Sequence, residues 1–180
     1  MEQTIRVNLL GAYYTMRAAA PHLSHDRGYF LAISSLAAAI HLPLLGAYCA
    51  SKAGVEALGN SFRIEMSPTG ARVGVAYFAE IDTEMTSRGF GTEAAQRLTS
   101  NAKPLFQVAP LGLAIRELEK GIAERARRIV APPRSRSALP LRMAAQPIAD
   151  RISRRGLREA LEIARREKAP LTTEQPGESP

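Results

Sequence analysis

Apolar residues recur at helical spacing through the first part of the chain, from about residue 3 to residue 23. The main positions lie three or four residues apart: Ile5, Leu9, Ala12, Met16 and Ala20. This spacing predicts a helix, and further apolar residues at Val7, Leu10 and Tyr14 predict that it is buried on two sides. Asn8 lies within this stripe. Because asparagine is a poor helix former, we expect its side chain either to have a specific partner or to mark a local kink.

Two short apolar runs, residues 29–33 and residues 73–78, flank a second helical segment. That helix is expected from Gly46 to about Met66, because Pro68-Thr69-Gly70 would stop it. A strand, a crossover helix and a second strand form the βαβ unit of a parallel sheet. A further helix over residues 110–126 and a strand over residues 129–131 continue the alternation. The pattern therefore predicts an α/β fold.

The composition changes at Pro132. Residues 132–138 are typical of a linker, and residues 139–166 are predicted to form an amphipathic helix; nine arginines lie between Arg134 and Arg166. Two alternatives remain for this helix. It either docks on the domain or on a second subunit, or it lies on an anionic membrane surface. Residues 169–180 are expected to be disordered.

The net charge of +7 is concentrated in this last part of the chain. Residues 1–124 hold eleven basic and eleven acidic residues, whereas residues 125–168 hold thirteen basic and four acidic ones. The basic charge therefore does not indicate a nucleic-acid-binding core. One cysteine, Cys49, excludes an internal disulfide, and no cluster of cysteine and histidine suggests a metal site. Without a signal-peptide pattern, we expect a cytoplasmic protein, with peripheral membrane contact as the alternative.

Two side chains with complementary chemistry lie four residues apart on the predicted helix over residues 46–66. Tyr48 and Lys52 would share one helix face. A neighbouring cation lowers the pKa of a phenol toward the range where it serves as a general acid–base. Ser35 ends the preceding strand and could donate a hydrogen bond to a carbonyl oxygen that gains negative charge. Alternatively, Lys52 forms an ordinary salt bridge to Glu56, and Tyr48 is a core residue.

The motifs around these residues resemble the short-chain dehydrogenase/reductase superfamily over residues 1–131. They are N-x-x-G at 8–11, S-S at 34–35, Y-C-A-S-K at 48–52, A-G-V-E-A-L at 53–58 and I-D-T at 81–83. The resemblance implies a partial Rossmann-like, doubly wound parallel sheet and a catalytic tetrad of Asn8, Ser35, Tyr48 and Lys52. Tyr48, Lys52, Ile81 and Thr83 would contact NAD or NADP. Relatives commonly have Pro-Gly where this chain has Phe78-Ala79, so the turn before Thr83 must be built differently.

The resemblance also implies a small-molecule alcohol or carbonyl substrate and a homo-oligomer formed through the helices at residues 3–23 and 46–66. Asn8 would hold a water molecule in a proton relay. Residues 86–108 would close over the substrate, with an apolar pocket wall formed by Phe90, Leu98, Leu105 and Phe106.

The family's glycine-rich cofactor loop has no counterpart in this sequence. Residues 69–76 resemble it superficially, but they lead into a predicted strand, whereas a phosphate-binding turn follows a strand and opens a helix. We expect roughly a hundred residues, the size of a βαβαβ half, to precede Met1. Two hypotheses of function follow. The chain is either the catalytic half of an NAD(P)-dependent oxidoreductase or a truncated, non-catalytic remnant that acts as an oligomerisation or interaction module.

Overall fold

The first helical segment of the chain is one continuous rod with an irregular turn inside it. In the computed structural model, which describes residues 1–84, 86, 93–99 and 107–166, the rod consists of α1 (Glu2–Ile5), a π-helical turn η1 (Arg6–Leu10) and α2 (Gly11–Leu23). The predicted helix over residues 3–23 is therefore confirmed. The π turn surrounds Asn8, and such turns are frequent at functional sites.

Three parallel strands form the sheet: β1 (Tyr29–Ser35), β2 (Arg72–Phe78) and β3 (Arg128–Ala131), in the order β1-β2-β3. Ser35 pairs with Phe78, and Phe78 pairs with Ala131, so the three strands end level with one another. The predicted α/β fold with a parallel sheet is confirmed. All three carboxyl ends lie at one edge, where parallel sheets of this kind carry their ligands.

Helix α3 (Gly46–Met66) connects β1 to β2 and packs closely on them. A Cβ atom at Gly59 would lie 2.8 Å from Cγ2 of Val75 and 3.3 Å from Cβ of Ala32, so only glycine permits this approach. A short 3-10 turn, η3 (Ser67–Thr69), ends the helix, and Gly70 then takes a left-handed conformation with φ +78°. The glycine-containing segment therefore leads into a strand, as predicted, and does not open a helix.

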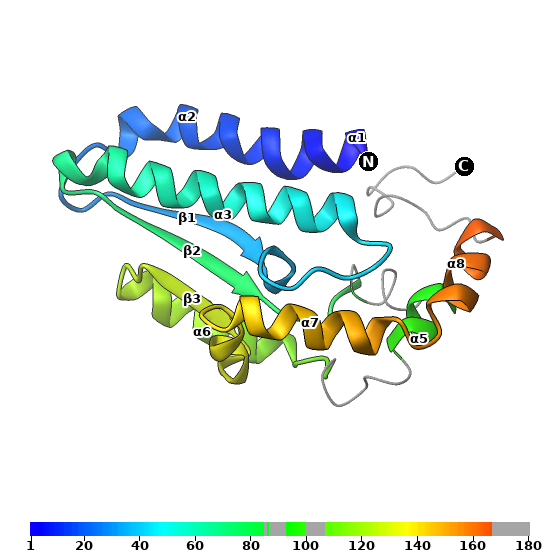
Figure 1. Ribbon diagram of the computed structural model, residues 1–180. Coiled ribbons are helices and arrows are strands. Elements are labelled where there is room, and N and C mark those ends of the chain that lie inside the picture. The colour runs from blue at the N-terminus through cyan, green and yellow to red at the C-terminus, as the bar shows by residue number, and fades with distance from the viewer. Residues whose placement is uncertain (85, 87–92, 100–106, 167–180) are drawn as a thin grey trace, which may run out of the picture.

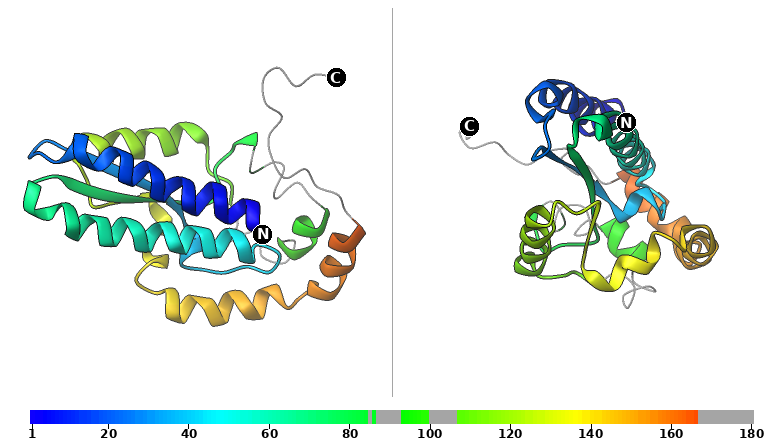
Figure 2. Two further views of the ribbon diagram at one scale, coloured as in Figure 1. Left: turned by 90° about the horizontal axis from the view of Figure 1, so that it is seen from above. Right: turned by 90° about the vertical axis from the view of Figure 1, so that its left-hand side faces the viewer.

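Helices cover the two faces of the sheet unequally. Helices α2 and α3 lie along one face, and α6 (Leu111–Ala123) lies on the other, beside β2 and β3 (Figures 1 and 2). The main core lies between α3 and the strands and includes Val55, Phe62, Val73, Val75 and Tyr77. Ile33 of β1 points away from this core and is 45% exposed. The face of β1 opposite α3 is therefore only partly covered.

The basic C-terminal segment forms two helices where we expected one. A 3-10 segment, η5 (Pro133–Ala138), precedes α7 (Arg142–Ser153) and α8 (Leu157–Arg166). Gly156 separates the two helices with φ +82°, a left-handed conformation that ends a helix. Helix α8 lies against α5 (Glu93–Thr99), and Arg97 forms an ion pair with Glu159 (Figure 1). The segment thus docks on the rest of the chain, as one of the two alternatives predicted.

Candidate active site

Ser35 is the last residue of β1, at the carboxyl edge of the sheet. Its hydroxyl donates a hydrogen bond to the carbonyl oxygen of Phe78 at 3.1 Å and accepts one from the N–H of Ala37, also at 3.1 Å. The second bond caps a short 3-10 turn, η2 (Leu36–Ala38). These contacts hold the serine, which is 9% exposed, at the point where the chain leaves the sheet.

Tyr48 lies in the first turn of α3, and its phenol lies near the Ser35 side chain. Burial raises the pKa of the Tyr48 phenol above its usual value of 10.0, and the neighbouring Ser35 side chain acts in the opposite direction. Negative charge at Cys49 and Glu80 raises the pKa further. The structure thus joins Ser35 and Tyr48, which are thirteen residues apart in the sequence, into one polar site.

Lys52 places its ammonium group 5.7 Å from the centroid of the Tyr48 ring. The Nζ atom donates a hydrogen bond to the carbonyl oxygen of Ile33 at 3.1 Å, and burial lowers the pKa of this lysine. The structure differs from one alternative and from one expectation of the sequence analysis. Glu56 forms its ion pair with Arg142 at 3.0 Å, not with Lys52. We also expected the pKa of Tyr48 to fall, but the loss of solvation on burial outweighs the favourable contacts.

Asn8 has the specific partner that its position predicted. Its Nδ2 atom donates to the hydroxyl of Ser51 at 3.1 Å, and that hydroxyl donates to the carbonyl oxygen of Tyr48 at 2.7 Å. The π turn thereby links the first helical rod to the backbone of the helix that carries Tyr48 and Lys52. A water molecule held by Asn8 in a proton relay stays a prediction.

Ile81 and Thr83 follow β2 at the same edge of the sheet. Ile81 is 7% exposed and forms an isolated bridge with Ala109. The hydroxyl of Thr83 donates to the carbonyl oxygen of Ile81 at 3.3 Å and lies 3.1 Å from the hydroxyl of Thr86. The turn is therefore closed by side-chain hydrogen bonds, although Phe78-Ala79 replaces Pro-Gly. Contact between these two residues and a cofactor stays a prediction.

The structure adds residues that the sequence analysis did not single out. Glu80 is the second residue after β2 and lies near Tyr48, and burial raises the pKa of its carboxyl group. Its place after a strand of a parallel sheet is a signal that could have identified it. Ser34 donates to the carbonyl oxygen of Lys52 at 2.8 Å. Of the predicted pocket wall, Leu98 lies in α5, whereas Phe90, Leu105 and Phe106 fall outside the described residues.

A family model described as "short chain dehydrogenase" matches residues 1–94, which is 94 of the 180 residues. The matched part includes the site just described. The chain therefore belongs to the short-chain dehydrogenase family.

Curated relatives are similar to the same part of the chain. Trans-4-hydroxycyclohexanecarboxylate dehydrogenase from Sinomonas cyclohexanicum is 33% identical over 92 residues, covering 49% of this chain and 36% of the relative. L-fucose dehydrogenase from Mus musculus is 39% identical over 71 residues, covering 39% of this chain and 26% of the relative. The chain thus matches about a third or less of each of these two dehydrogenases.

The solved structure of a short-chain dehydrogenase from Burkholderia cenocepacia J2315 in complex with NADP superimposes with a TM-score of 0.62. It is 22% identical, and the match covers 80% of this chain and 56% of that one. At this identity the likeness concerns the fold. It agrees with the Rossmann-like arrangement of strands and helices described above.

Proposed function

We propose that the chain carries the catalytic half of an NAD(P)-dependent oxidoreductase that interconverts an alcohol and a ketone. The observation that carries this proposal is the convergence of Ser35, Tyr48 and Lys52 at the carboxyl edge of the sheet. The Ser35 side chain lies near the Tyr48 phenol, and the ammonium of Lys52 lies 5.7 Å from the Tyr48 ring. Family membership and the dehydrogenase names of the relatives support the same reaction class.

Proton transfer is the role proposed for Tyr48. In ketone reduction, the carbonyl carbon receives a hydride and the phenol of Tyr48 gives its proton to the carbonyl oxygen. In alcohol oxidation, the Tyr48 phenolate accepts the hydroxyl proton and the hydride leaves the carbon. Ser35 turns its O–H from the carbonyl of Phe78 to the substrate oxygen and stabilises the charge that develops there. The positive charge of Lys52 favours the phenolate.

A nicotinamide cofactor would supply or accept the hydride when bound. Lys52 fits contact with it, because an ammonium has three N–H donors and the bond to Ile33 uses one of them. Tyr48, Ile81 and Thr83 would complete the nicotinamide end of the site. A glycine-rich turn for the pyrophosphate has no counterpart in this sequence. We therefore expect residues 1–180 alone to bind NADH and NADPH weakly or not at all and to be catalytically inert.

The test is hydride transfer by residues 1–180 fused behind the cofactor-binding half of the Sinomonas dehydrogenase. Tyr48→Phe should abolish turnover while the far-ultraviolet circular dichroism spectrum stays unchanged. Tyr13→Phe is the matched control, because Tyr13 lies in α2 and is 37% exposed. If the Tyr48→Phe fusion keeps more than a few per cent of the unmutated rate, the assignment of Tyr48 is wrong.

The second candidate is an interaction module without catalysis, and it is favoured by the apolar residues on the outer side of the first helical rod. Val7 is 65% exposed and Tyr14 is 61% exposed. Such residues are typical of a helix that a second subunit covers. We propose a homo-oligomer in which this rod and α3 pack against a second copy. Oligomerisation is compatible with either candidate, so only the hydride-transfer assay separates them.

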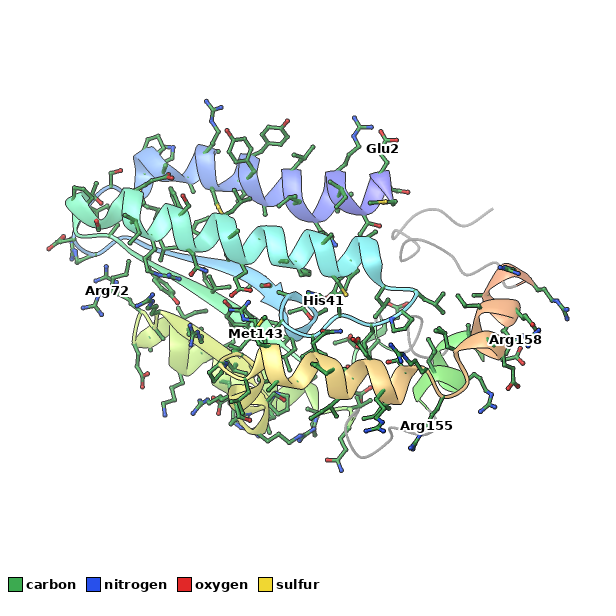
Figure 3. The ribbon with its side chains drawn as sticks, viewed as in Figure 1. Glu2, His41, Arg72, Met143, Arg155 and Arg158 are labelled. Carbon is green, nitrogen blue, oxygen red and sulfur yellow. The ribbon has the colours of Figure 1, made fainter. Side chains whose placement is uncertain are left out.

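We also propose that the outward face of α7 contacts an anionic membrane surface. Its docked face carries Arg142, Gln146 and Ser153, and Met143 and Ile148, away from that face, are exposed apolar residues. Arg151, in the last turn of α7, and Arg154 and Arg155, directly after it, are exposed, and Figure 3 shows Arg155 extending outward from this end of the helix. Apolar residues beside arginines fit the lipid interface. Among the described residues, no helix has the length and apolar character needed to cross a bilayer.

A further inference from the structure

Helix α7 is bonded to the loop that joins the two halves of the candidate active site. Gln146 pairs with the backbone of His41 through both ends of its amide: Oε1 accepts from the His41 N–H at 2.8 Å, and Nε2 donates to the His41 carbonyl oxygen at 3.0 Å. His41 lies in the loop that faces α7 (Figure 3). Bonds to both the N–H and the carbonyl oxygen of His41 fix the position and the orientation of its backbone, as pairing with a neighbouring β-strand would.

The same face of α7 is also bonded to α3. Arg142, one turn before Gln146, contacts both oxygens of the Glu56 carboxylate, at 3.0 Å and 3.3 Å. Glu56 is 8% exposed and lies one turn after Lys52 on α3. Residues four apart on a helix share a face. Through Arg142 and Gln146, α7 therefore holds the loop and the catalytic helix at a fixed separation.

The loop over residues 36–45 needs such support. It begins directly after Ser35 and ends directly before α3, so its path determines where Ser35 meets Tyr48. Leu44 has φ +67°, a left-handed conformation that costs a branched side chain energy unless its surroundings hold it. Within the described residues, the other backbone bonds of the loop are local, such as Ile40 N–H to the Leu36 carbonyl and Leu45 N–H to the Leu42 carbonyl.

We propose that Gln146 and Arg142 are positioning residues and that α7 is a brace that fixes the loop and thereby the Ser35–Tyr48 pair. This role rests on the proposed function, since it gives the active site its geometry. It predicts that a change on α7, more than a hundred residues away in sequence from His41, alters the titration of Tyr48. A contact that merely stabilised the fold would leave that titration unchanged.

The first experiment compares hydrogen exchange of Gln146→Ala and unmutated residues 1–180. Loss of two hydrogen bonds should speed exchange in peptides covering residues 36–45 by roughly tenfold, with peptides of β1 and of the second half of α3 unchanged. Gln107→Ala is the matched control, because the Gln107 side chain is exposed and forms no hydrogen bond within the described part of the chain. The second readout follows the Tyr48 phenol by ring-carbon NMR, with the signal assigned from Tyr48→Phe.

In Gln146→Ala, the pKa of Tyr48 should rise, because Ser35 at the start of the loop is no longer held beside the phenol, whose pKa it lowers. Faster exchange throughout the chain would overturn the proposal, since Gln146 would then support only global stability. Unchanged loop exchange, or an unchanged Tyr48 titration beside faster loop exchange, would overturn it as well. Neither readout depends on hydride transfer, so an inactive fusion protein would count against the proposed function without deciding this one.

Discussion

Arg142→Gln removes the positive partner from the Arg142–Glu56 ion pair, which attaches α7 to α3. The Glu56 side chain in that pair is 10% exposed, whereas the Arg142 side chain is 42% exposed. Breaking a buried ion pair typically costs about 3–5 kcal/mol, and an exposed pair contributes about 0.2–1 kcal/mol. Because one side chain of the pair is buried and the other is partly exposed, we expect the loss of stability to lie between these limits, at about 1.5–3 kcal/mol. Glu56 would then lie beside the Tyr77 phenol without its charged partner.

Thermal unfolding followed by circular dichroism measures this loss. For a chain of this size, about 1 kcal/mol shifts the Tm by about 2–4 °C, so we expect a fall of about 3–12 °C. Arg151→Gln is the matched control, because it makes the same charge change on the outward face of the same helix. Its effect should stay within about 0.5 kcal/mol. Equal Tm values for the two variants would refute the reasoning.

Three further outcomes follow from the fold. Burial and the nearby negative charge of Glu56 raise the pKa of Tyr77 from 10.0 to about 12; the unfolded chain therefore ionises first, and stability should fall between pH 10 and pH 12 by roughly 2–3 kcal/mol. Urea unfolding should show this slope, and Tyr77→Phe should reduce it, leaving the smaller part that comes from the phenol of Tyr48, whose pKa is also raised. Light scattering should give an oligomer for residues 1–180 and a smaller mass for Tyr14→Glu; a monomer without the mutation would rule out the proposed interface. Co-sedimentation with phosphatidylserine vesicles should fall when Arg151, Arg154 and Arg155 become glutamine, but not for Arg127→Gln with Arg128→Gln; equal losses would contradict a specific surface.

The fold was largely predictable because each element has a local signal. Helix α3 begins and ends where predicted, since Pro68 and Gly70 stop it and no proline lies inside it. The strands are short apolar runs, and the strand–helix–strand order limits them to a parallel arrangement. Two helices instead of one in the basic segment follow from Gly156, a single residue whose left-handed conformation the amphipathic pattern does not show.

The candidate site was predictable only where its residues are close in sequence. Helical geometry alone brings Tyr48 and Lys52 together, and the end of β1 supplies Ser35. The pairing of Arg142 with Glu56 spans 86 residues, and one arginine among many gives no sign of its partner. The direction of the Tyr48 pKa shift was wrong for a related reason. It depends on how far packing removes the phenol from water, which spacing along a helix does not determine.

The central claim is that Ser35 and Tyr48 act as one acid–base site. The most direct measurement is the ring-carbon NMR titration of Tyr48 in Ser35→Ala beside Ser34→Ala. The two neighbouring serines have different partners: Ser34 donates to the carbonyl oxygen of Lys52, whereas Ser35 donates to the carbonyl oxygen of Phe78. Loss of the Ser35 hydroxyl, which lowers the pKa of Tyr48, should raise that pKa, whereas Ser34→Ala should leave it unchanged. The same Tyr48 pKa in both variants and in the unmutated chain would contradict the account.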